Sequence, residues 1–224
     1  DPVGRLAATS AYEVTVTFGD RASATRAAQR VRAVHEHVRG VDQVTGQPYA
    51  AGDPALLLWV HAALVDSGLA TSALFGTPLT AADADRYVAE MTIAAELLGV
   101  PHEMIPDSVA ALDRYFDGVR ADLRRTPAAG ESMSYLLDPP GLDVDIAELW
   151  QDIRDAAVLA LPGWAVQMYG YAEPTPLTAE RRTEIRQALG VLDAVFLGEP
   201  GVLEARQRII ARMRSAGKKR AGAT

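Results

Sequence analysis

Two histidines set in apolar sequence, His35 and His61, are the residues of this chain best suited to chemistry. A neutral imidazole carries one donor and one acceptor, so in a protein core it needs a hydrogen-bond partner, a metal ion or a cofactor. His37 lies two residues from His35 and would point in nearly the opposite direction on a helix, which excludes a metal ion shared by this pair. For His35, a hydrogen-bonded core residue and a ligand both remain open.

The spacing of small and apolar residues predicts a helix over 20–39 with His35 on its buried face. Asp20 is the expected N-cap and Gly40 the expected C-terminal stop of this helix. The apolar face recurs in steps of three and four and comprises Ala24, Ala27, Ala28, Val31, Val34, His35 and Val38.

A second helix, expected over 53–74, carries His61 in a segment that is apolar on all sides. Its most buried face should hold Leu57, Val60, His61, Leu64 and Val65. A histidine there needs a carbonyl, a carboxylate, a propionate or a metal as partner, and a core hydrogen bond is the simpler alternative.

Arg5 and Thr9 form the third candidate, because an i, i+4 spacing puts a guanidinium and a hydroxyl on one helix face. Such a pair suits an anion or an oxygen species, although a surface arginine beside a threonine gives the same pattern. The chain has no cysteine, which excludes thiolate ligands and a cysteine nucleophile. It also lacks a nucleophile elbow, a Walker loop and a dinucleotide fingerprint.

Helical periods dominate the chain and predict an all-α, single-domain multi-helix bundle of about eight to ten helices. Glu13–Phe18 alternates like a strand but has no evident partner strand, so we expect helix. The loops should be 41–52, 126–144 and 172–177. The expected helices are 5–18, 20–39, 53–74, 80–99, 107–125, 145–160, 163–171, 178–197 and 200–215.

The overall composition narrows the class of partner. The 224 residues include 22 Lys and Arg against 29 Asp and Glu, a net charge of −7 that argues against nucleic acid. We expect no membrane span, a cytoplasmic location, a domain over 1–217 and a basic tail over 218–224. A homo-oligomer is compatible with the sequence. The chain starts at Asp1 without Met, and we expect further residues upstream.

Several short motifs, taken in order, resemble the MpaB-type oxygenase family, which includes the catalytic domain of rubber oxygenase, the latex clearing protein. The ordered motifs span residues 1 to 68. They are Arg5-Leu-x-x-Thr9, Phe18-Gly19, Val34-His35-x-x-Val38-Arg39-Gly40, Gly46-x-Pro-Tyr49, Asp53-Pro54 and Leu58-Trp-Val-His61-Ala.

The resemblance implies a helical fold around a haem-sized apolar pocket that binds haem b. It puts the proximal iron ligand at His35 and the residues beside the haem that are needed for activity at Arg5 and Thr9. Arg39 would bind a haem propionate, and His61 would be a pocket residue. The expected partners are dioxygen and a small hydrophobic substrate, with oxidative cleavage of a carbon–carbon double bond as the candidate reaction.

Two departures from the family matter. Rubber oxygenase has a lysine just before its threonine, where this chain has Ala8. The family also usually has an upstream helical segment that could supply a catalytic acid or base. Two alternatives therefore stay open, a helical binding protein that keeps the fold without haem, and a zinc hydrolase using His35, His61 and a carboxylate.

Overall fold

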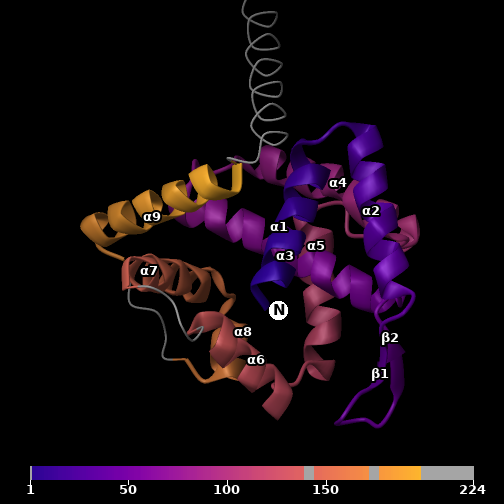
Figure 1. Ribbon diagram of the computed structural model, residues 1–224. Coiled ribbons are helices and arrows are strands. Elements are labelled where there is room, and N and C mark those ends of the chain that lie inside the picture. The colour runs from indigo at the N-terminus through magenta and orange to yellow at the C-terminus, as the bar shows by residue number, and fades with distance from the viewer. Residues whose placement is uncertain (1, 139–143, 172–176, 198–224) are drawn as a thin grey trace, which may run out of the picture.

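The computed structural model describes residues 2–138, 144–171 and 177–197, and these residues form the expected all-α fold with one small β-hairpin (Figure 1). The expected helix over 200–215 and the basic tail lie outside the described residues. The helices are α1 (Pro2–Phe18), α2 (Arg21–His35), α3 (Pro54–Phe75), α4 (Ala81–Leu98), α5 (Val109–Val119), α6 (Pro127–Leu137), α7 (Val144–Ala160), α8 (Gly163–Tyr169) and α9 (Ala179–Leu197).

Local capping sets several of these boundaries, and the sequence predicts the cap at Asp20. Asp20 accepts the backbone N–H of Ser23 at 2.7 Å and begins α2. Thr80 does the same for α4, and Gly99 ends that helix in the left-handed region, at φ +103°. The strand-like Glu13–Phe18 segment is helical, as expected.

The expected helix over 20–39 is too long, because α2 ends at His35. The chain then turns into strand β1 (Arg39–Val41), which pairs antiparallel with β2 (Pro48–Ala50) in a region expected to be loop. Asp42 holds the connecting turn by accepting two backbone N–H groups. The backbone that a longer helix would use internally is therefore bonded across the hairpin.

Gly40 is part of this hairpin and is not the helix stop that the sequence predicts. It pairs with Tyr49, and a Cβ atom at Gly40 would lie 2.6 Å from the Tyr49 hydroxyl oxygen. A side chain at this position would displace the Tyr49 ring, so cross-strand packing favours glycine here.

Helix α6 lies within the expected loop 126–144. Thr126 caps it by accepting the N–H of Ala129, and Pro127 occupies its first turn, which is a favourable helix start. The Trp150 indole of α7 donates a hydrogen bond to the Leu136 carbonyl, so α6 is tied to the next helix.

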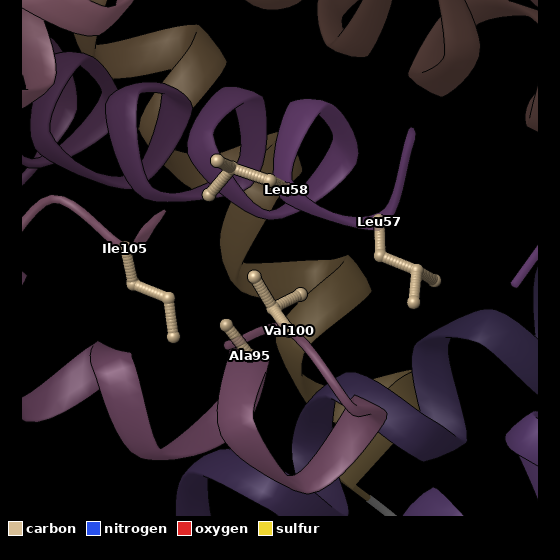
Figure 2. Close-up of a cluster of buried hydrophobic side chains, with 5 residues drawn as sticks. All are labelled: Leu57, Leu58, Ala95, Val100 and Ile105. Carbon is tan, nitrogen blue, oxygen red and sulfur yellow. The ribbon is translucent and has the colours of Figure 1, made fainter. Parts of the chain in front are cut away.

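Helix α3 runs through the middle of the molecule and packs against α4, α7 and α9. Figure 2 shows one of its buried clusters, in which Leu57 and Leu58 meet Ala95, Val100 and Ile105. By length and composition alone, α3 is also apolar enough to cross a membrane, with a mean hydropathy of 1.4, and a minority of that stretch is buried.

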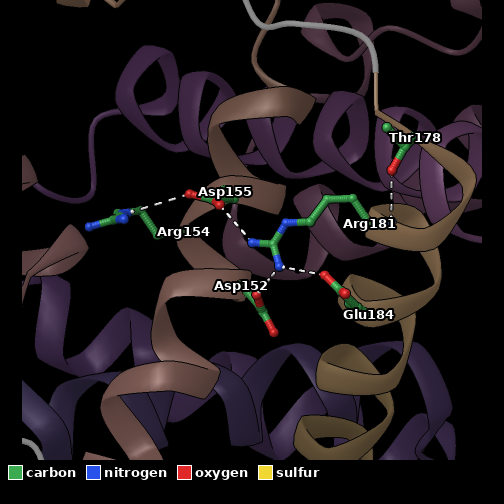
Figure 3. Close-up of polar contacts among 6 residues, drawn as sticks. All are labelled: Asp152, Arg154, Asp155, Thr178, Arg181 and Glu184. Carbon is green, nitrogen blue, oxygen red and sulfur yellow. Dashed lines mark hydrogen bonds and ion pairs between the residues drawn. The ribbon is translucent and has the colours of Figure 1, made fainter.

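Helix α9 is fixed to the rest of the bundle by its arginines. Arg181 reaches Asp152 and Asp155 of α7, both at 2.7 Å, and Glu184 of its own helix at 3.0 Å (Figure 3). Arg182 and Arg186 donate to the carbonyl oxygens of Leu74 and Phe75, at 3.1 Å and 2.8 Å. These carbonyls end α3 and have no partner within the helix, so α9 caps the C-terminus of α3.

Candidate functional site

His35 is the last residue of α2, and it is half-buried. The small residues Ala24, Ala27 and Ala28 are buried as expected. The C-terminal part of the predicted apolar face is not, because Val34 is 62% exposed and Val38 is 43% exposed. The helix ends here, and no described element covers these valines, so the prediction of one continuous buried stripe is wrong.

His37 and His102 differ from His35 in exposure and in hydrogen bonding. His37 is exposed, and its ring bonds to the Ala33 carbonyl. His102 is exposed and contacts the carboxylate of Glu96. The His35 ring has no hydrogen bond to another described residue.

His61 lies in α3 and is 8% exposed, which confirms its predicted burial. Burial lowers its pKa from 6.5 to about 4, so the imidazole is neutral at physiological pH. Among the described residues, none forms a hydrogen bond with its ring. The predicted burial of its neighbours is partly wrong, since Val60 is 56% exposed and Leu64 is 39% exposed. The helix thus has one open face, although its sequence is apolar all round.

The remaining predicted site residues lie on two elements. Arg5 and Thr9 belong to α1, where Thr9 is exposed, and the Arg5 side chain is outside the described part of the structure. Arg39 is exposed in β1. Ala8 is exposed next to Thr9. Across the described ranges, no three His, Asp or Glu side chains gather closely enough to hold a metal ion, so the zinc alternative gains no support.

A cluster of side chains on α1 that includes Tyr12 and Glu13 was not predicted from the sequence. Tyr12, Glu13 and Val16 lie three, four and seven residues after Thr9 and share its helix face. The hydroxyl oxygen of Tyr12 is buried and has no hydrogen-bond partner among the described residues. Burial raises the pKa of the Glu13 carboxyl. The spacing from Thr9 was the signal that could have identified these residues.

Tyr87 of α4 belongs to the same cluster. Burial and the nearby Glu13 carboxylate raise the pKa of the Tyr87 hydroxyl, and burial followed by Glu13 does the same for Tyr12. A Cβ atom at Gly68 of α3 would lie 2.4 Å from the Tyr87 hydroxyl oxygen. The glycine therefore makes room for the tyrosine between α3 and α4.

A shallow pocket of about 450 Å³ opens at the C-terminal half of α3. Its wall combines hydroxyl groups, small residues and two apolar side chains, and it has no titratable side chain. The lining residues are Ser67, Gly68, Thr71, Ser72, Phe75, Gly76 and Leu189. This volume is within the range of small-molecule sites.

Comparison with known protein families assigns the chain to one of them. The family described as "ER-bound oxygenase mpaB/B'/Rubber oxygenase, catalytic domain" matches residues 1–194, well beyond the first 68 residues in which the sequence motifs lie. There is no significant match among curated proteins and none among solved structures. The match covers most of the chain, so this protein belongs to the family of MpaB and rubber oxygenase catalytic domains.

Proposed function

We propose that this protein is a haem b-dependent oxygenase that acts on a hydrophobic organic substrate, with oxidative cleavage of a carbon–carbon double bond as the candidate reaction. His35 is the proposed proximal iron ligand, and Arg39 and His61 are proposed cofactor-binding residues. Arg5 and Thr9 are proposed to act at the position of dioxygen. The proposal rests on membership in an oxygenase catalytic-domain family and on the burial and hydrogen bonding of His35 and His61.

The observation that carries the proposal is the unpartnered ring of His35. It is half-buried, yet it lacks a hydrogen bond to another described residue, and the valines around it are exposed. A porphyrin needs a neutral imidazole and an apolar surface to lie against. The residues present therefore fit a haem. His61 adds an imidazole in apolar surroundings that burial keeps neutral, with its pKa lowered to about 4.

Haem, when bound, supplies the redox chemistry and the activation of dioxygen. The chain itself supplies an imidazole at His35, a cation at Arg39 for a propionate, and exposed apolar side chains at Val34 and Val38 that a porphyrin would cover. Arg39 is exposed and has no ion pair with a described residue, so its charge is available. At position 8 the alanine offers no amine as an iron ligand.

Haem titration of the purified protein tests the assignment. Free haem has a Soret band of its own, so we expect a saturable shift and sharpening of that band on addition of the protein, and loss of this change in the His35→Ala variant. His37→Ala is the matched control, because His37 is two residues away, exposed and already bonded to Ala33. A spectrum that stays that of free haem would refute haem binding, and equal spectra for the two variants would refute His35 as the ligand.

A second candidate is a helical binding protein that keeps the family fold without redox chemistry. The pocket on α3 favours it, because no titratable side chain lines that pocket. This candidate predicts no bound iron after supply of haem, together with a loss of stability but no spectral change when His35 is replaced. Elemental analysis for iron separates the two candidates, and the same measurement reports zinc.

A further inference from the structure

The exposed face of α3 forms an uncharged stripe along the helix. Leu56 is 41% exposed, Val60 56% and Leu64 39%, and the hydroxyl residues Ser67 and Thr71 continue the same exposed face. The steps of four, four, three and four residues keep all five side chains on one side of the helix. At 1.5 Å per residue the stripe is about 22 Å long.

This stripe leads directly into the pocket at the end of α3. Ser67 and Thr71 belong to both, so the apolar part of the stripe and the pocket form one continuous surface. Phe75 and Leu189 add apolar walls at the far end, where α9 crosses. A surface of this shape, long and apolar with hydroxyl groups near one end, suits an extended aliphatic chain.

Positive charge lies at the pocket end of the stripe. Arg186 donates from Nε to the Phe75 carbonyl, and Arg182 donates from Nη1 to the Leu74 carbonyl. Neither guanidinium has a carboxylate partner among the described residues, whereas Arg181 of the same helix has three. In a chain of net charge −7, two cations that contact only neutral carbonyls favour an anionic partner.

We infer that this surface binds a long-chain carboxylate, with the carboxylate near Arg186 and the aliphatic chain running through the pocket and back along Leu64 toward Val60. From Phe75, whose carbonyl Arg186 contacts, back to Val60 the helix spans about 22 Å, which is comparable to the length of an extended fatty acid. The inference does not depend on haem, because no residue of the stripe or pocket is a proposed haem ligand.

The test uses the full chain without haem and a fluorescent probe, dansylated undecanoic acid, displaced by palmitate. We expect one displaceable site per chain, no displacement by butyrate, and competition by cetyl alcohol. Replacing Arg186 with Gln should weaken palmitate about tenfold, since a charged hydrogen bond is lost, and should leave cetyl alcohol unchanged. Leu64→Gln should weaken both ligands.

Two further variants locate the site. Thr71→Trp should block the probe by filling the pocket, and since Thr71 is exposed the fold should tolerate it. Ile93→Gln is the control, because Ile93 is an apolar residue of α4 that is 56% exposed and belongs to neither the stripe nor the pocket lining. Circular dichroism checks that each variant is folded.

Three results would overturn the inference. The first is failure of palmitate to displace the probe. The second is equal palmitate affinity in the Ile93, Leu64 and Arg186 variants, which would indicate unspecific adsorption. The third is sedimentation with phosphatidylcholine vesicles that palmitate does not relieve, which would make the stripe a membrane-contacting face.

Discussion

The buried imidazole of His61 should make the stability of this protein depend on pH in a defined range. Its pKa is about 4 in the folded chain, against an ordinary value of 6.5. Between these values the unfolded chain binds a proton that the folded chain does not. The contribution of His61 to the free energy of unfolding is therefore largest above pH 6.5 and falls as the pH drops toward 4.

The magnitude follows from the size of the shift. A shift from 6.5 to about 4 corresponds to a loss of about 3 kcal/mol between pH 7 and pH 4. About 2 kcal/mol of this is already lost at pH 5. The side chain is 8% exposed, so screening by solvent reduces the effect little.

Urea unfolding of the wild type and of His61→Leu at pH 7, 6, 5 and 4 isolates this contribution. Leucine removes the titration and leaves no buried polar atom, so the two proteins should differ in free energy of unfolding by no more than about 1 kcal/mol at pH 7. The variant should gain about 3 kcal/mol on the wild type by pH 4. All other titrating groups cancel in the difference.

Val65→Ala is the matched control, one helical turn away and 1% exposed. It should lose about 1–3 kcal/mol through packing alone, by the same amount at every pH. A His61→Leu difference that does not change between pH 7 and pH 4 would refute the reasoning, because it would mean that the imidazole takes up its proton equally well in the folded chain.

Three further perturbations follow from the packing. Arg181→Met should lower the free energy of unfolding by about 1–2 kcal/mol, and by less in high salt, because it breaks contacts with three carboxylates. In the same denaturation experiment, the control Arg154→Met should lower it by under about 0.5 kcal/mol, because the nearest carboxylate to Arg154 is 3.7 Å away. Gly68→Ala should lower the free energy of unfolding by about 1–3 kcal/mol, because the new methyl group displaces the Tyr87 hydroxyl. In a protein that also carries Tyr87→Phe, most of this loss should disappear. If the loss stays the same, the clash lies elsewhere. Glu13→Gln should gain stability relative to the wild type as the pH rises above 4.5, because burial raises the pKa of Glu13 and its ionised form is disfavoured; a constant difference across that range would contradict it.

Residue spacing was enough to predict the all-α class and most helices. Asp20, Thr80 and Gly99 end or begin helices through bonds to residues within a few positions, so the information is local. The burial of His61 was also predictable, because it lies in the most apolar segment of the chain.

Contacts between distant segments decided the rest. The end of α2 at His35 depends on pairing of β1 with β2. Gly40 packs under the Tyr49 ring in this hairpin and does not end a helix. The cluster of Tyr12, Glu13 and Tyr87 joins helices far apart in sequence.

The sequence by itself determined the helical elements, their caps and the ordered motifs that mark the family. Only the tertiary structure decided which faces of those helices are covered. Val60 and Leu64 look like core residues in the sequence, yet they are exposed, because periodicity gives the side of a helix and not what packs on it. The same reason explains why the stripe on α3, its pocket and the arginines of α9 were not visible before the helices were assembled.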